Sequence, residues 1–466
     1  MNGKFFLLIF TIAILLMNGC TLSPKYEKPP APIPEEWPKG AAYQETIGPT
    51  PPEIKWPDFI ADEKLKKIIE QALRNNRDLR LAALQVQKVR ALYNIQRAEL
   101  YPTVSASGTG SVQRVPADLS PKGHEMTAEQ YSINLGISSW EIDFFGRLQS
   151  LKDQALEEYL ATEQARRSAQ ISLISAVATA YLALAADREN LKIAESTLAT
   201  QQDVYNLIRR RYEVGIASEL ELQQAQTQLE AARGEVARYT QLVAQDENAL
   251  HLLVGSPLPK ELLPEELSRI SPPTEVSAGL PSEVLLRRPD ILAAEHRLKG
   301  VNAFIGAARA AFFPRIALTT SVGTASSELS GLFKSGSGTW SFLPQIIMPI
   351  FDARTWAAYE ASQVEREIAL TQYEKTIQVA FKEVADALAV KGTIEERISA
   401  QESLVKALQE TYRLANLRYM RGIDSYLGVL DAQRALYAAQ QGLVALRLAK
   451  VANQVKLYAV LGGGGD

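Results

Sequence analysis

The stretch Arg418–Gln433, which reads RYMRGIDSYLGVLDAQ, has a counterpart earlier in the chain at Arg211–Gln226, which reads RYEVGIASELELQQAQ. Eight of the sixteen positions are identical at an offset of 207 residues. A second set of matches lies upstream at an offset of 212 residues and comprises Asp78, Ala82, Val89, Ala98 and Pro102 against Asp290, Ala294, Val301, Ala310 and Pro314. Self-similarity of this kind indicates an internal two-fold repeat. We expect the copies at residues 58–281 and 282–466.

The segment before each glycine turn is predicted to be one very long helix. Residues 151–214 contain neither proline nor glycine, and at 1.5 Å per residue such a helix would be about 96 Å long. Apolar residues recur at every seventh position, at Val177, Leu184, Leu191, Leu198, Tyr205 and Tyr212, and in the second copy at Leu370, Ile377, Val384, Ile398, Val405, Tyr412 and Tyr419, with Lys391 as the one interruption. A seven-residue repeat predicts left-handed supercoiling, with an ordinary helical bundle as the plainer alternative.

Four long helices are therefore expected, at residues 151–214, 216–254, 355–421 and 425–460. The last of them carries two apolar series, one of which is broken by Lys450. A two-stranded coiled coil needs one narrow seam, so several seams indicate that each helix has neighbours on both sides, like the staves of a barrel.

Short segments of a different composition separate the helices. They are rich in Ser, Thr, Gly and aromatic residues and are expected as strands at about 102–115, 130–145, 314–327 and 339–351. Alternating strands of about ten residues are typical of membrane β-barrels. Four strands are too few to close a barrel, for which about eight are needed. If these strands span a membrane, several chains must share one barrel.

The N-terminus is predicted to be a signal peptide, residues 1–19. The apolar run from Phe5 to Met17 is too short to span a bilayer and is followed by Cys20, the single cysteine of the chain. This arrangement resembles a bacterial lipoprotein signal, and an ordinary signal peptide with a stray cysteine is the alternative. Residues 20–57 are rich in proline, which predicts an extended, lipid-anchored arm.

Composition argues against several classes of protein. Lys and Arg number 50 against 53 Asp and Glu, a net charge of −3, so the basic excess of a nucleic-acid-binding protein is missing. One cysteine rules out a disulfide framework and any cysteine-based zinc site. The three histidines are far apart and form no metalloprotease spacing. We therefore nominate no catalytic, cofactor-binding or metal-binding residue.

Three motifs carry a resemblance to a known family: LRRPDI at 286–291, AARAAFFP at 307–314 and GIDSYLGVLDAQ at 422–433. They resemble the outer membrane factors of tripartite efflux pumps, in the lipoprotein branch of the TolC-like family. The likeness covers nearly the whole chain after residue 19, including the order of its parts and the duplication. The family assignment implies an outer-membrane exit channel of a Gram-negative bacterium that passively conducts small molecules.

The resemblance also implies an assembly and partners. Three chains would give four strands each to a twelve-stranded outer-membrane barrel, continued by a helical barrel through the periplasm. Residues 256–281, the arm and the C-terminal tail would form a belt around it. An inner-membrane RND-type pump and a periplasmic adaptor would be the partners, and outer-membrane lipid the surroundings. Cys20 would carry S-diacylglycerol and N-acyl groups, with no other cofactor.

The resemblance places a gate at the periplasmic tip. The tip turns would lie at Gly215 and Gly422, and the constriction at Leu427 and Asp431, which spacing i, i+4 puts on one helix face. Plain heptad packing of Leu427 and a surface carboxylate at Asp431 are the alternatives. The resemblance further implies closing contacts at Arg418, Tyr419 and Arg434.

Three other functions were weighed. The outer-membrane duct of a type I protein-secretion system would share the fold, but the lipid anchor and the Leu427/Asp431 pattern favour drug efflux. An enzyme is disfavoured because the sequence contains no catalytic constellation. A coiled-coil protein without a pore would explain neither the strand segments nor the duplication.

Overall fold

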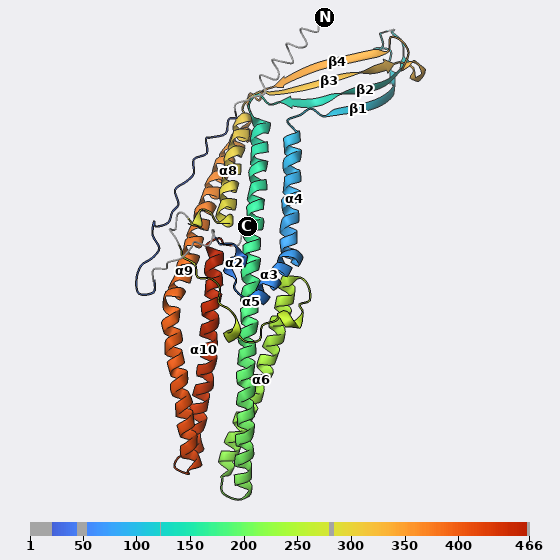
Figure 1. The fold of residues 1–466 in the computed structure, drawn as a ribbon. Helices are drawn as coiled ribbons and strands as arrows, with labels where there is room; N and C mark the ends of the chain where they lie inside the picture. Colours follow the sequence, from blue (N-terminus) through green and yellow to red (C-terminus); the bar gives the residue numbers. More distant parts are fainter. Residues whose placement is uncertain (1–20, 44–53, 122, 279–283, 464–466) are drawn as a thin grey trace. The chain divides into compact units, whose positions relative to one another are not determined.

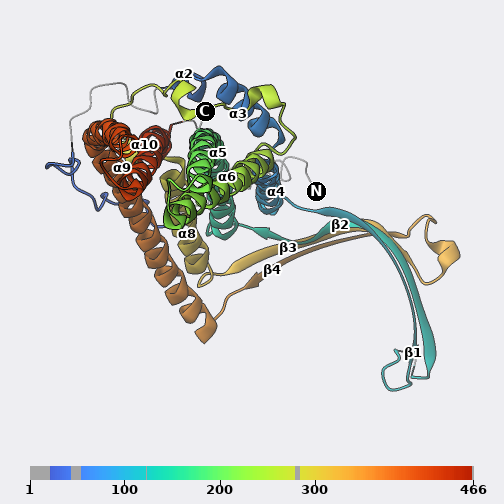
Figure 2. The ribbon, with the colours of Figure 1, turned by 90° about the horizontal axis from the view of Figure 1, so that it is seen from below.

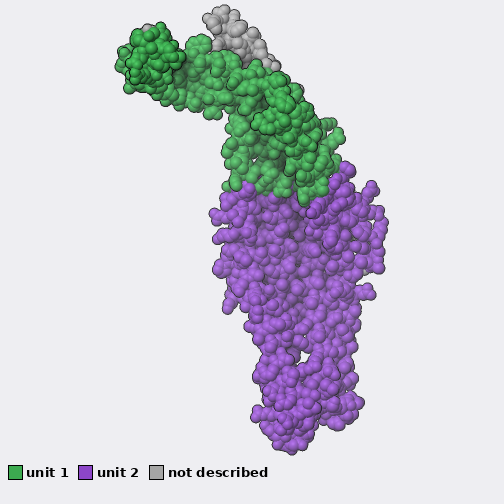
Figure 3. Space-filling view, turned by 180° about the vertical axis from the view of Figure 1, so that it is seen from behind, with its two compact units in different colours: residues 1–29, 86–162, 294–373 green, residues 30–85, 163–293, 374–466 purple. Residues whose placement is uncertain are grey.

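The computed structural model describes residues 21–43, 54–121, 123–278 and 284–463, and it is mainly helical with one small sheet (Figure 1). The chain divides into two compact units (Figure 3). Unit 1 comprises residues 1–29, 86–162 and 294–373, and unit 2 comprises residues 30–85, 163–293 and 374–466. The expected signal peptide and Cys20 lie outside the described residues.

Unit 1 contains a four-stranded antiparallel sheet. Its strands follow one another across the sheet in chain order and are β1 (Val104–Val115), β2 (Met126–Ile142), β3 (Arg315–Ser326) and β4 (Gly338–Ile347). β1 pairs with β2 and β3 with β4 as hairpins. The central pair, β2 and β3, joins the two copies of the repeat, with an irregularity in register between Ile137 and Trp140.

The strand boundaries differ from the expected ones by a few residues. β2 begins at Met126 rather than at 130 because Met126 pairs with Val115 at the end of β1. β4 ends at Ile347 rather than at 351 because Ile347 pairs with Arg315, the first residue of β3. Strand ends are thus set by the partner strand, which the local pattern does not contain.

Both edge strands lack a partner within the described chain. β1 pairs only with β2, and β4 pairs only with β3. All ten residues of β4 are exposed, and its large apolar side chains are Trp340, Phe342, Leu343, Ile346 and Ile347. In a bilayer, unpaired backbone groups on such edges would cost several kcal/mol each. The sheet therefore requires neighbours outside this chain if it lies in lipid.

The helices of unit 1 include most of α8 (Pro289–Ala310) and the first part of α5 (Arg147–Glu213). α5 begins at Arg147 rather than at 151 because Asp143 accepts hydrogen bonds from the backbone N–H groups of Arg147 and Gln149, over 2.7 and 2.8 Å. A carboxylate in this position satisfies N–H groups that the first helical turn leaves unpaired.

The start of the proline-rich arm is extended and lies on α8. The side-chain amide of Asn302 donates to the carbonyl of Pro24 over 2.7 Å, and Ser23 Oγ donates to the carbonyl of Ala303 over 3.0 Å. A Cβ at Gly306 would lie 2.1 Å from Ser23 Oγ, so this contact needs glycine there. The arm is held against the helix at this end.

Unit 2 is built on two long helical hairpins, in which α5 lies beside α6 and α9 beside α10 (Figures 1 and 2). The other three helices of the hairpins are α6 (Glu219–Val254), α9 (Ala353–Met420) and α10 (Tyr426–Val460). α6 begins at Glu219 rather than at 216 because Ser218 and Glu221 form a capping box. Among the described residues, only α5 has the length and apolar content to cross a bilayer, and 56% of its most apolar window is buried.

The lysines that interrupt the apolar series have specific partners. Lys391 Nζ donates to the carbonyl of Val276 over 3.1 Å, in the segment that follows α6, and burial lowers the pKa of Lys391. Lys450 forms an ion pair with Glu395 over 2.5 Å. Lys391 therefore attaches the segment that follows α6, which was expected to be part of a belt, to α9. Lys450 links α9 to α10.

Unit 2 also contains two helices near the end of the arm, α2 (Trp56–Phe59) and α3 (Glu63–Asn75). The arm was expected to remain extended to residue 57, yet Pro57 lies in α2. This is possible because the first helical turn needs no N–H from that residue. The Phe59 ring stacks on Tyr458 of α10 with centroids 3.9 Å apart, which fixes α2 to the core.

Two carboxyl groups interact between α5 and α6, at Asp187 and Asp246. Burial raises the pKa of both, and repulsion from Asp187 contributes to a pKa of about 6 for Asp246. Two close carboxylates cannot both ionise without cost, so this pair tends to share a proton.

The candidate gate at the helical tips

The two tip turns have the same backbone geometry. Gly215 and Gly422 have φ angles of 76° and 72°, a left-handed conformation that glycine adopts without strain. The Gly215 N–H donates to the carbonyl of Tyr212 and the Gly422 N–H to that of Tyr419, both over 2.9 Å. Each turn thus ends one long helix and starts the next, as the glycines in the repeat predicted.

The turns of the two copies differ in charge, and one of the differences gives an arginine of the second copy a partner. In the second copy Arg418 donates to both carboxylate oxygens of Asp424, in one case over 3.0 Å. In the first copy the position of Asp424 is occupied by Ala217, at the repeat offset of 207. Arg211, the counterpart of Arg418, therefore has no carboxylate at the equivalent position of its own turn.

Arg211 instead contacts the other hairpin. Its Nη1 donates to Tyr419 Oη over 3.3 Å, and its guanidinium carbon lies 5.3 Å from the centre of that ring. Tyr419 is 6% exposed and lies 5.2 Å from the Tyr426 ring, centre to centre. Burial raises the pKa of both tyrosines, which therefore stay neutral.

A small apolar core surrounds this contact and joins the two hairpins near their tips. Its buried members are Ile208, Ala225, Tyr419, Tyr426, Val429 and Leu430. They come from α5, α6, α9 and α10, so all four helices contribute to the same cluster. Burial of such side chains stabilises the packing by roughly 25 cal/mol per Å² of apolar surface.

The expected constriction residues are exposed on α10. Leu427 is 52% exposed, and Asp431 is exposed with no hydrogen bond or ion pair within the described part of the chain. Their counterparts in the first copy, at the offset of 207, are Leu220 and Gln224. An acidic residue is therefore present at this position in the second copy alone.

Arg434 makes its contact with the first hairpin rather than with Asp431. Its Nε donates to Gln228 Oε1 of α6 over 3.4 Å. Tyr437 and Gln441 continue this row of contacts along α10 by donating to Glu235 and Tyr239 of α6. A cavity of about 270 Å³ lies beside the row, lined by residues of α5, α6 and α10.

The sequence reasoning named Arg418, Tyr419 and Arg434 but missed Arg211 and Tyr426. The repeat contained a clue to Arg211, because Arg211–Tyr212 and Arg418–Tyr419 are the same dipeptide in the two copies. It did not indicate that the contact would join an arginine of one copy to a tyrosine of the other.

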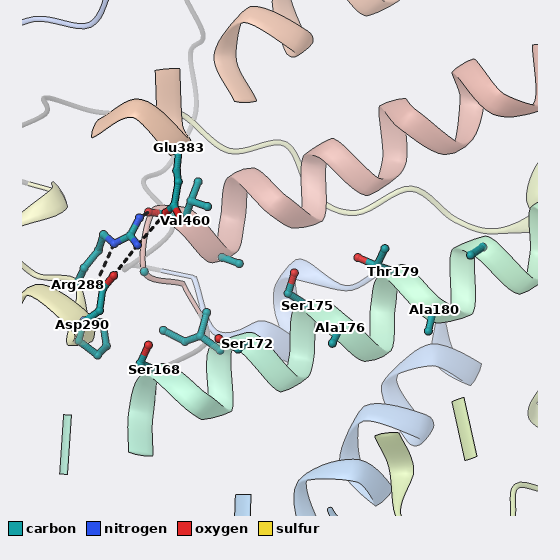
Figure 4. A pocket seen from close by; sticks show the side chains of 15 residues that line it. Ser168, Ser172, Ser175, Ala176, Thr179, Ala180, Arg288, Asp290, Glu383 and Val460 are labelled. Atoms are coloured by element: carbon teal, nitrogen blue, oxygen red, sulfur yellow. Dashed lines mark hydrogen bonds and ion pairs between the residues drawn. The ribbon is translucent and has the colours of Figure 1, made fainter. Parts of the chain in front are cut away.

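The motif LRRPDI forms a second polar site in unit 2 (Figure 4). Arg288 is 8% exposed and donates to both oxygens of Asp290, to Glu383 of α9 and to the carbonyl of Val460 at the end of α10. Although burial lowers the pKa of Arg288, these partners raise it above its usual value. A cavity of about 700 Å³ lies beside the cluster, and its other wall is the small-residue face of α5. Arg288 thus ties the start of α8 to α9 and α10.

The duplicated hairpins, the open-edged sheet and the paired tips are the features of an outer-membrane channel protomer. Comparison with known sequences gives the same class. The outer membrane efflux protein family matches residues 68–256 and 280–463. The chain belongs to this family.

Individual relatives match over nearly their whole length. The chain is 50% identical over 462 residues to the probable efflux pump outer membrane protein TtgC of Pseudomonas putida, covering 98% of this chain and 95% of the relative. It is 42% identical over 454 residues to the outer membrane protein OprJ of Pseudomonas aeruginosa, covering 97% and 94%. The solved open state of the MtrE outer membrane channel of Neisseria gonorrhoeae superposes with a TM-score of 0.86 at 37% identity, covering 96% and 98%. The chain is thus an outer-membrane efflux protein.

Proposed function

We propose that three copies of this chain form one exit duct for small molecules. The observation that carries the proposal is the sheet with two unpaired edges, β1 and β4, and exposed apolar side chains along β4. Lipid offers no hydrogen-bond partners to open edges, so closure with neighbouring copies satisfies both. Three copies supply twelve strands and close a barrel of the usual size range. Light scattering of the purified protein in detergent should give a trimeric mass; a monomer that still conducts ions would contradict this.

The names of the relatives support a cargo of small molecules and a pump as partner. TtgC is described as a probable efflux pump outer membrane protein, and other relatives in Pseudomonas putida are described as solvent and toluene efflux proteins. We infer that this chain conducts drugs or solvents delivered by an inner-membrane RND-type pump through a periplasmic adaptor. A type I secretion duct is the less supported alternative, because these relatives are efflux proteins.

The gate of the duct would lie at the tip of the α9–α10 hairpin. Leu427 and Asp431 are one helical turn apart, exposed, and without polar partners in the described chain, so both are available to meet their copies at a three-fold axis. Three leucines would form an apolar plug, and three carboxylates an acidic ring that prefers cations. The Arg211–Tyr419 contact would hold the two hairpins together in the closed position, and the Arg418–Asp424 contact would stiffen the turn of the second hairpin.

Conductance of the purified trimer in planar bilayers tests the gate. Leu427→Ala with Asp431→Ala should raise conductance well beyond either single change, and in cells it should admit vancomycin. Leu220→Ala with Gln224→Ala is the matched control, because it makes comparable changes at the equivalent positions of the first copy. Equal conductance of the Leu427/Asp431 variant and the wild type at several pH values would place the constriction elsewhere.

A further inference from the structure

A cationic cavity lies in unit 1 between the arm, α8 and α9. It has a volume of about 450 Å³, and the charged residues that line it are Lys25, Arg309, Arg366 and Glu367. Three cations against one carboxylate leave a net charge of +2 in a chain whose net charge is −3. None of its lining residues belongs to the candidate gate.

The cations of the cavity are poorly neutralised. Within the described residues, Lys25 and Arg309 have no ion pair, and the Arg309 guanidinium donates only to the carbonyl of Leu22, over 3.3 Å. Arg366 pairs with the adjacent Glu367 over 2.8 Å, and their side chains are 40% and 64% exposed. An exposed pair of this kind is weak, so Arg366 remains available to another anion.

Aromatic residues next to the cavity indicate its depth relative to the membrane. Phe312 packs edge-on against Trp356 and Tyr359, with ring centres 4.8 and 6.0 Å apart, close to where β3 and β4 begin and end. Trp and Tyr collect at the boundary between hydrocarbon and headgroups, both in general and as girdles around membrane barrels. The Arg309 guanidinium lies 5.8 Å from the centre of the Tyr359 ring, at the same level.

The cavity therefore lies at headgroup depth. Arg366 follows Tyr359 by seven residues, about 10 Å along α9. Side chains of a helix lean towards its N-terminus, which for α9 is the end next to β4, so Arg366 leans back towards the aromatic residues. The headgroup layer on one side of a bilayer is about 5–8 Å thick, so the Arg366 guanidinium reaches it through this backward lean.

We propose that this cavity binds the phosphate of an anionic glycerophospholipid in the periplasmic leaflet of the outer membrane. Lys25, Arg309 and Arg366 would bind the phosphate oxygens, and exposed Val364 with the edge of Ile305 would contact the glycerol and the first acyl carbons. The bond from Asn302 to Pro24 holds the arm at the rim and places Lys25 there. The proposal rests on the outer-membrane location and not on the gate.

The test uses the full-length trimer in nanodiscs made from equal amounts of dioleoylphosphatidylglycerol and dioleoylphosphatidylcholine. Native mass spectrometry after release counts the lipids that each trimer retains. The wild type should retain phosphatidylglycerol in preference. Lys25→Gln with Arg366→Gln should reduce that preference roughly thirtyfold, since each of the two cations contributes about 1 kcal/mol near a lipid surface and about 1.4 kcal/mol is a factor of ten. Arg309 is left in place because it also contacts the arm and Tyr359.

The control is Lys406→Gln with Arg413→Gln, which removes two exposed cations from α9 outside unit 1 and should leave the preference unchanged. The trimeric mass in the same spectra verifies that each variant is assembled. Equal retention of both lipids by the wild type, or an unchanged preference in the Lys25/Arg366 variant, overturns the proposal. If glycerol 3-phosphate or inorganic phosphate displaces phosphatidylglycerol as effectively as the lipid itself does, the cavity is a site for free anions. That result also overturns the proposal.

Discussion

Arg211 of the first copy bonds to Tyr419 of the second over 3.3 Å, whereas the reciprocal partners, Arg418 and Tyr212, do not meet. Arg418 is held by Asp424, and Tyr212 is 41% exposed. One of the differences between the turns, alanine at 217 against aspartate at 424, leaves Arg211 without the carboxylate that binds Arg418. The duplicated tips are therefore alike in backbone and unlike in charge.

The Arg211–Tyr419 contact should restrain the tip. Tyr419→Phe keeps the ring in the core and removes the hydroxyl, and Arg211→Gln removes both the charge and the contact with the ring. We expect Tyr419→Phe to lower the stability of the closed tip by about 1 kcal/mol and Arg211→Gln to lower it by about 2 kcal/mol. Single-channel recordings should then show correspondingly more frequent opening. Tyr212→Phe is the matched control because that exposed tyrosine has no such contact. Equal opening frequencies in all three variants would show that the contact does not hold the tip.

Transfer of the aspartate to the first copy tests the origin of the asymmetry. Ala217→Asp should bind Arg211 within its own turn, as Asp424 binds Arg418, and so release Tyr419. The variant should then reproduce the opening frequency of Arg211→Gln. Ala217→Asn has nearly the same shape without the charge and should behave more like the wild type. If the Asp and Asn variants open equally often, the steric change at residue 217, and not the charge, is responsible for the altered opening.

The Asp187–Asp246 pair predicts a pH dependence of stability. Burial and repulsion raise the folded-state pKa of Asp246 to about 6, above its unfolded value near 4. Its stabilising contribution is thus fully present below about pH 4 and is lost as the pH rises through about 6.

Asp246→Asn should remove that dependence. Because the Asp246 carboxyl group is partly solvated, we expect the substitution to raise the free energy of unfolding by only about 1 kcal/mol near pH 7.5 and by almost nothing near pH 4. Thermal melting of the helical circular dichroism signal at both pH values measures it. Asp203→Asn, at an exposed carboxylate of α5, should change neither value. A variant that melts like the wild type across the range would argue against a shared proton.

Cys20→Ser tests the proposed lipid anchor. The serine variant cannot accept the thioether-linked lipid, so it should bind the membrane more weakly while still forming trimers, since Cys20 lies outside both repeat copies. Mass spectrometry of the mature wild-type N-terminus gives the direct answer. An unmodified Cys20, or a mature chain that starts elsewhere, excludes the anchor.

The duplication, the long helices and the tip turns could all be predicted because each depends on residues close together in the chain. A run without glycine or proline continues a helix, a seven-residue apolar series supplies its packing face, and a glycine ends it in a left-handed turn. Gly215 and Gly422 lie at the tips for that reason. The motifs around Arg288 and Leu427 likewise indicated the family without any knowledge of their contacts.

Contacts between elements far apart in the chain were decided by the tertiary structure alone. The partner of Lys391, the pairing of β2 with β3 and the choice of Arg211 rather than Arg418 as the bridge depend on where segments separated by about a hundred residues or more meet. Local propensity and periodicity specify what each element is and which face is apolar. They do not specify which polar side chains of two packed elements come within hydrogen-bonding distance, because that depends on their relative position along and around each other.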